Sequence, residues 1–127
     1  MDQSSHIFDV AVEGNSVLVT PKSCLTEFDF AQIELEGKRV VQWLQDRSEA
    51  NILLDLSNSD YFGSSAVGFF MKLWKWARTK KGKMVVTNSS AHALELIRLI
   101  QADKLWHLTD TRAQGLEWLK SQNELAS

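Results

Sequence analysis

The first apolar segments of the chain are short and rich in β-branched residues, and polar residues separate them. Ile7–Val12 and Val17–Thr20 flank the dipeptide Gly14-Asn15. Because glycine readily adopts the positive φ of a tight primed turn, this pattern predicts a β-hairpin. Pro21 has no backbone donor and is expected to end the second strand.

A polar loop and a helix are predicted next. The segment Lys22–Asp29 is polar but contains Leu25 and Phe28, which we expect to pack beneath the loop. From residue 30 onward the apolar residues recur at the spacing of one helix face. These residues are Phe30, Ile33, Val40, Val41 and Leu44. Gly37 falls on the same face and is expected to let the helix approach a sheet closely.

The middle of the chain predicts a buried strand, a long helix and a second buried strand. Asn51–Ser57 is an apolar run bounded by polar residues, which is typical of a strand covered on both faces. A helix is predicted from about Ser64 to Thr79, with Gly82 as its stop signal. Met84–Thr87 is the next apolar run and predicts another strand.

The last third repeats this order. Ser89 or Ser90 can cap a helix, and a short strand is predicted over Trp106–Thr109. The apolar residues of the capped helix are Ala93, Leu96, Ile97 and Ile100. Thr111–Gln114 fits a capping box, which would open a final helix through Leu116 and Leu119.

The resulting order, ββαβαβαβα, predicts an α/β fold in a single domain over residues 1–127. Alternating strands and helices imply parallel strands joined by crossovers. We therefore expect one mixed sheet, with an N-terminal hairpin plus three parallel strands, packed with about four helices. The residues expected in the core include Ile52, Leu54, Phe70, Leu73, Ala77, Val85 and Ile97.

Composition and charge narrow the functional class. The chain has 127 residues, 44% of them hydrophobic, and a formal net charge of −2. This charge provides no general attraction to nucleic acid or anionic membranes. No apolar run reaches the length of about 18 residues that a transmembrane helix needs. The polar start of the chain and the single Cys24 favour a cytoplasmic protein without disulfides.

Residue patterns for catalysis and for cofactor binding are missing from the sequence. His6, His92 and His107 share no metal-ligand spacing with each other or with the cysteine, and no glycine-rich phosphate loop follows a predicted strand. Asp55 and Asp60 could form an acid–base pair, but separate carboxylates flanking a loop are the more ordinary interpretation. We expect a protein-binding domain that is not an enzyme and holds no metal or cofactor.

A basic run accompanies two tryptophans in the predicted helix 64–79. The lysines and arginine of this run are Lys72, Lys75, Arg78, Lys80, Lys81 and Lys83, and they surround Trp74 and Trp76. Stacking on nucleic acid would use such residues. However, Lys72 and Lys75 project away from the apolar face, as on any helix packed against a core. A solvated surface is favoured, followed by a docking patch for an acidic partner.

A more specific pattern lies in the second half of the chain. It consists of a strand ending in Asp55-Leu56-Ser57, an aromatic turn at Tyr61-Phe62, and a serine-containing step into a helix at Gly63–Ala66. A glycine-containing turn and an apolar strand follow. With this order of motifs, residues 50–119 resemble the STAS domains of bacterial anti-sigma factor antagonists. Ala102–Trp106 resembles the family's step before its last strand, and Gln114–Leu119 resembles its closing helix. The resemblance implies the same α/β fold.

The resemblance also implies a switch. In that family the second serine of an Asp-Ser-Ser step is phosphorylated by a partner, an anti-sigma factor that is also a serine kinase of the histidine-kinase-like ATPase type. By position this implicates Ser65, with Ser64 as second choice. Gly63 and Ala66 replace the family's Asp and Gly. For the two serines, the alternative role is simple helix capping. For the whole protein, the alternatives are a transporter accessory subunit without phosphorylation and a small-ligand-binding module.

A helical projection extends the candidate site. At about 100° per residue, Ser65 shares one azimuth with Phe69, Lys72 and Trp76. This stripe has the composition of a docking surface, so these residues and Ser64 are the partner-binding candidates. The projection also predicts that Trp76 is more exposed than Trp74.

Overall fold

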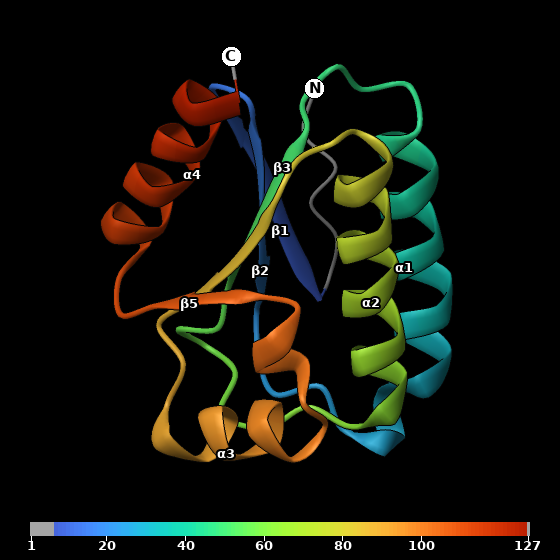
Figure 1. Ribbon diagram of the computed structural model, residues 1–127. Helices are drawn as coiled ribbons and strands as arrows, with labels where there is room; N and C mark the ends of the chain where they lie inside the picture. Colours follow the sequence, from blue (N-terminus) through green and yellow to red (C-terminus); the bar gives the residue numbers. More distant parts are fainter. Residues whose placement is uncertain (1–6, 127) are drawn as a thin grey trace.

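The computed structural model describes the backbone of residues 7–126 and the side chains of residues 7–122. The described chain contains a five-stranded sheet in the order β1-β2-β3-β4-β5 (Figure 1). Its strands are β1 (Phe8–Glu13), β2 (Ser16–Pro21), β3 (Asn51–Asp55), β4 (Met84–Thr87) and β5 (His107–Thr109). The first two strands pair antiparallel and all later neighbours pair parallel. The predicted mixed sheet is confirmed.

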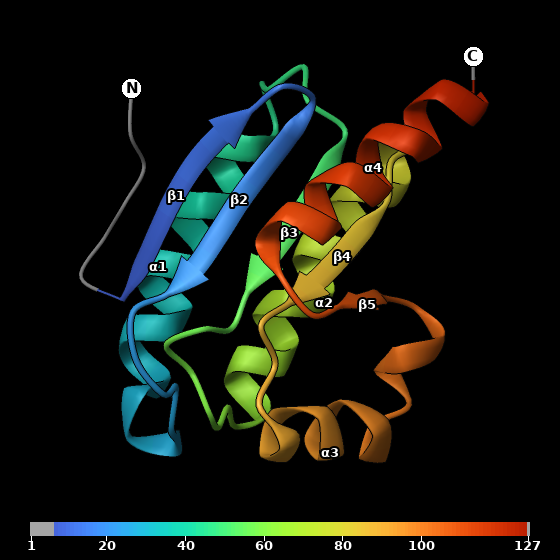
Figure 2. The ribbon, with the colours of Figure 1, turned by 90° about the vertical axis from the view of Figure 1, so that its left-hand side faces the viewer.

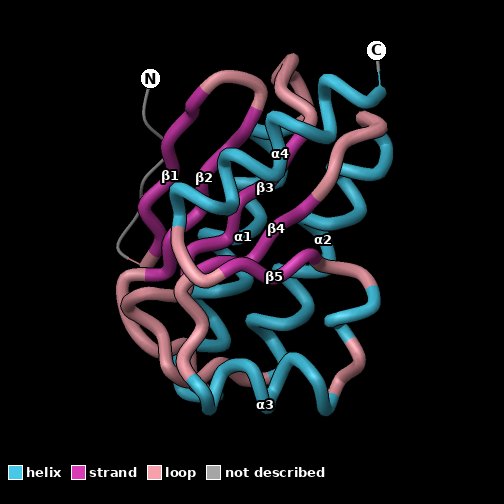
Figure 3. The backbone as a smooth tube through the Cα atoms, turned by 60° about the vertical axis from the view of Figure 1, so that its left-hand side comes forward, coloured by secondary structure: helices cyan, strands magenta, loops and turns pink. Residues whose placement is uncertain are grey.

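Helices cover both faces of this sheet. They are α1 (Phe30–Leu44), α2 (Ser64–Thr79), α3 (Ala91–Leu99) and α4 (Arg112–Ala126), with short 3₁₀ turns η1 (Glu27–Asp29) and η2 (Ala102–Lys104). Helices α1 and α2 lie side by side on one face, and α4 crosses the other (Figures 1 and 2). Helix α3 lies beyond the end of the sheet (Figure 3). No helix in the described part of the chain has the length and apolar character needed to cross a membrane.

The sheet divides the core into two layers. In β3, Ile52 and Leu54 point toward α1 and α2, whereas Leu53 points toward α4 and packs with Leu119. This alternation explains why the strand sequence is apolar throughout, since both faces are covered. All seven residues predicted for the core are buried.

Capping fixes three helix boundaries. Ser90 accepts a hydrogen bond from the Ala93 amide and starts α3. Thr111 and Gln114 form the predicted capping box, since each side chain accepts from the other residue's amide. At the end of α2 the chain turns at Lys81, whose φ is +61°. Gly82 has a different role, because a Cβ there would lie 1.8 Å from the Ala50 carbonyl oxygen.

Four side-chain expectations were wrong. Phe28 is 99% exposed, because the capping box of Thr26 orients η1 so that Phe28 points outward. Phe30, at the first position of α1, is 57% exposed. Ile100 lies past the end of α3 and is exposed. Gly37 does not face the sheet: its missing side chain makes room for Phe69 of α2, 3.0 Å from the ideal Cβ position.

Candidate protein interface at the start of α2

Two loops meet where α2 begins. The backbone of Leu25 pairs with the segment before α2: its amide donates to the Tyr61 carbonyl at 3.1 Å, and the Gly63 amide donates to its carbonyl at 2.8 Å. The Leu25 side chain is fully buried. The loop before α1 is thereby fixed against the loop before α2, and together they form a defined surface.

Ser64 and Ser65 occupy the first turn of α2. Ser64 is exposed and Ser65 is half-buried. The N-cap residue is Gly63, which has no side chain to accept hydrogen bonds from the first-turn amides. Free amides and the positive end of the helix dipole favour an anion at this position.

Both serines open onto a hollow of about 230 Å³ between α1 and α2, which we call the α1–α2 groove. Lys38 and Glu34 of α1 line one side, and Lys72 of α2 lines the other. Phe69 lies at its base and is only 4% exposed. The groove therefore joins two hydroxyls, two ammonium groups and a carboxylate around an apolar base.

The prediction of an exposed aromatic stripe was wrong. Trp76 is 8% exposed, and its indole N–H donates to the Leu44 carbonyl at 3.0 Å. Trp74, predicted to be the less exposed, is half-exposed and lies under the Arg78 guanidinium. The azimuths were correct, but α1 packs over this side of α2. Ser64, Ser65, Phe69, Lys72 and Trp76 all line the seam between the two helices, with Lys72 at its exposed edge.

Glu27 is a member of this site that the sequence reasoning missed. Its carboxylate accepts a 2.5 Å hydrogen bond from the Tyr61 hydroxyl, which lowers the pKa of Glu27. The same hydrogen bond raises the pKa of Tyr61. A Cβ at Gly63 would lie 3.0 Å from the Glu27 carboxylate. Glu27 therefore places a negative charge at the start of α2, beside Gly63.

Asp55 and Asp60 do not share partners. The Asp55 carboxylate is buried and accepts from Asn88 and Arg112, each at 3.0 Å. Asp60 is exposed and lies 3.7 Å from His92 Nδ1. Their separate partners give no support to an acid–base pair. Within the described residues there is also no group of three metal-ligating side chains.

Comparison with known proteins places the chain in a family. The model of the STAS domain matches residues 14–115. The chain belongs to the STAS domain family. A search of curated protein sequences gave no match for this STAS domain.

Solved structures share the fold of this STAS domain at low sequence identity. A candidate anti-sigma factor antagonist from Thermotoga maritima is 18% identical, with a TM-score of 0.78 over 91% of this chain and 96% of that one. An anti-sigma-factor antagonist (STAS) domain protein from Planctomyces limnophilus is 19% identical, with a TM-score of 0.76 over 88% and 96%. The unphosphorylated form of the anti-sigma factor antagonist SpoIIAA is 12% identical, with a TM-score of 0.73 over 90% and 96%.

Proposed function

We propose that this STAS domain is an anti-sigma factor antagonist that acts by binding and is not an enzyme. Its partner would be an anti-sigma factor that is also a serine kinase of the histidine-kinase-like ATPase type. The interface would comprise the start of α2 and the α1–α2 groove, and phosphorylation of Ser65, or failing that Ser64, would release the partner. A cytoplasmic location and the absence of a cofactor belong to the same proposal.

One observation carries this proposal: two serines on an uncapped first turn of α2 open onto a groove edged by Lys38 and Lys72. A kinase can reach hydroxyls at this position without unfolding the helix. The amides of the first turn and the two ammonium groups would stabilise the phosphate that results.

The proposed release mechanism is electrostatic. A phosphate on Ser65 would add about −1.5 to −2 charges at neutral pH. Glu34 lines the same groove and Glu27 lies at the start of α2, so the added charge would be repelled by two carboxylates and attracted by two lysines. The side chains of the groove would rearrange around the phosphate. A partner surface matched to a neutral hydroxyl would then lose its fit.

Calorimetry with the cognate anti-sigma factor tests this proposal. Ser65→Asp is expected to weaken binding by at least about tenfold, the effect of bringing an unmatched charge into an interface, whereas Ser65→Ala should change it little. Ser48→Asp is the control, because it adds the same charge at an exposed serine that lies beyond the far end of α1. Phosphate mapping on protein from its native cell should locate the modification at Ser65 or Ser64.

The opposite results would favour a constitutive complex. Equal affinities for Ser65→Asp and Ser65→Ala, with intact melting curves, would contradict the switch and leave the serines as ordinary first-turn residues. A stable complex with an unphosphorylated protein from a transporter would support an accessory subunit instead.

A further inference from the structure

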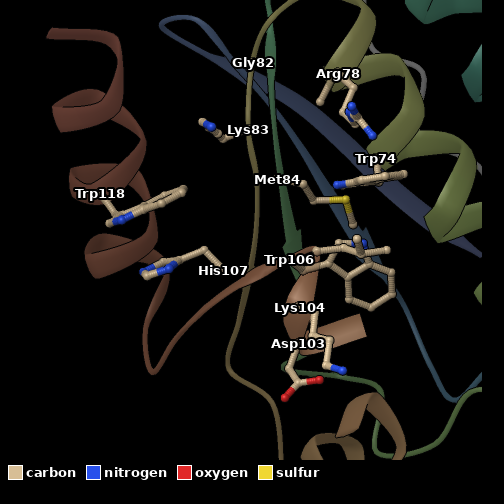
Figure 4. Close-up of a pocket in the computed structure, with 12 residues that line it drawn as sticks. Trp74, Arg78, Gly82, Lys83, Met84, Asp103, Lys104, Trp106, His107 and Trp118 are labelled. Carbon is tan, nitrogen blue, oxygen red and sulfur yellow. The ribbon is translucent and has the colours of Figure 1, made fainter. Parts of the chain in front are cut away.

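A second hollow, of about 410 Å³, lies at the edge of the sheet and shares no lining residue with the α1–α2 groove. Four elements form its walls: the end of α2, the start of β4, the segment from η2 into β5, and α4 (Figure 4). We call it the tryptophan pocket, because Trp74, Trp106 and Trp118 all line it. Its volume falls in the range of small-molecule sites.

The aromatic walls are flat and fixed in place. Trp118 stacks on His107 with ring centroids 3.9 Å apart and planes 7° from parallel. Trp106 is 2% exposed and packs edge-on against Phe70. In Figure 4, Trp118 and His107 lie on one side of the pocket, and Trp74 and Trp106 lie on the other. Such walls favour a planar apolar body between them.

The charges around this pocket are mostly positive. Arg78, Lys83 and Lys104 line it, and Asp103 is the one acidic side chain among the lining residues. Burial lowers the pKa of His107 and so favours its neutral imidazole. In the described part of the chain, none of the three cations forms an ion pair with a carboxylate. The chain as a whole carries −2, so the charge of the pocket is opposite in sign to the net charge of the chain.

The cations that line the pocket offer hydrogen-bond donors only. A ligand held by Arg78, Lys83 or Lys104 must therefore accept hydrogen bonds. The indole N–H of Trp106 has no hydrogen-bond partner among the described residues, but it is buried, so the ring would have to shift before a ligand could reach this donor.

We propose that the tryptophan pocket binds a small planar aromatic anion, with a carboxylate or phosphate attached to its ring. The ring would lie between the tryptophan walls. The anionic oxygens would accept hydrogen bonds from Lys83 or Arg78. The pocket is independent of the proposed antagonist function, since none of its residues lies at the start of α2 or in the α1–α2 groove.

Nuclear magnetic resonance titration of the full chain tests the proposal with three probes: 2-naphthoate, 2-naphthyl phosphate and the neutral 2-naphthamide. The five tryptophans give separate indole signals, and Trp106→Phe assigns the relevant one. The signals of Trp106 and His107 should shift most. An anionic probe should bind at least about tenfold more tightly than the amide, as expected for charge-assisted hydrogen bonds. The better of the two anions then distinguishes carboxylate from phosphate.

Exposed lysines provide matched variants that leave the core untouched. Lys83→Gln should weaken the binding of the better anion by about fivefold to tenfold, whereas Lys81→Gln, two residues away and outside the pocket, should not. Equal affinities for anion and amide, or an unaffected Trp106 signal, would overturn the proposal. An acidic aromatic peptide that binds more tightly than either anion would also overturn it, in favour of a docking site for a protein.

Discussion

Three donors from distant parts of the chain converge on the Asp55 carboxylate at the end of β3. They are the Ser57 amide, the Asn88 side chain and the Arg112 guanidinium, each at 3.0 Å. Burial alone would raise the pKa of Asp55, but these hydrogen bonds outweigh it and the pKa is lowered. The Asp-Leu-Ser step thus joins the loop after β4 and the start of α4 to the sheet.

Asp55→Asn is therefore expected to destabilise the fold by about 1–2 kcal/mol at pH 7, because Arg112 is half-exposed and regains water when it loses its partner. Since the folded pKa is lowered, the stabilisation is complete above the ordinary pKa of an aspartate and is lost as the pH falls through the folded value. Melting temperatures between pH 7 and pH 2 should fall less steeply for Asp55→Asn than for the native chain. Asp60→Asn, at an exposed site, is the control. If the melting temperatures of all three proteins fell equally steeply with decreasing pH, the expectation would be refuted.

At the scale of elements, the packing of α1 on α2 depends on a single missing side chain. Phe69 fills the space over Gly37, and its ring lies 4.6 Å from that of Phe8, so it has little room to move. An alanine at position 37 would gain about 1 kcal/mol in helix propensity, but overpacking costs about 1–3 kcal/mol.

Gly37→Ala should consequently lower the melting temperature, whereas Gly68→Ala should raise it. Gly68 is also helical, but nothing lies within 4 Å of its ideal Cβ position, so only the gain in propensity remains. Calorimetric melts of the two variants provide the comparison. A stabilised Gly37→Ala would mean that Phe69 can move aside and that the two helices are not closely fixed.

For the packing of α1 on α2, only the local features could be predicted from the sequence. The bounds of α2 were predicted correctly, because helical periodicity and the stop after Thr79 are local signals. The exposure of Trp76 was predicted wrongly, because a projection of one helix contains no information about the helix that covers it. Glu27 was missed for a related reason: it contacts Tyr61, a residue 34 positions away, through a loop without periodic pattern.

For the whole molecule, the order of strands and helices was sufficient to predict the mixed sheet, since parallel neighbours require crossovers. Ser64 and Ser65 were chosen as candidates through the resemblance to the family, and their role stays a prediction. The tryptophan pocket was not predicted, because its walls come from α2, β4, β5 and α4 and no short segment of the sequence contains all of its lining residues. Two of its basic residues, Arg78 and Lys83, had instead been interpreted as part of a solvated surface.

Helix α2 connects the two proposed sites, with the serines at its start and Arg78 near its end. Ser65 and Arg78 are thirteen positions apart, which corresponds to about 20 Å along the helix axis. Charges on a protein surface are screened over about 8–10 Å at physiological salt, so a charge at one site should not be felt at the other. A rigid helix that packs in a single arrangement has no second conformation through which binding at one site could affect the other.

Ser65→Asp is accordingly expected to leave the affinity of the tryptophan pocket for 2-naphthoate or 2-naphthyl phosphate unchanged, within about twofold, and Lys83→Gln should leave partner binding unchanged. Calorimetry on each variant and on the double variant measures both affinities. If the two sites are coupled, the small anion and the partner must change each other's affinity by the same factor, because coupling between binding sites is reciprocal. Reciprocal changes would show that α2 has two arrangements and that the small anion regulates the partner. Unchanged affinities would establish two separate functions on one small fold.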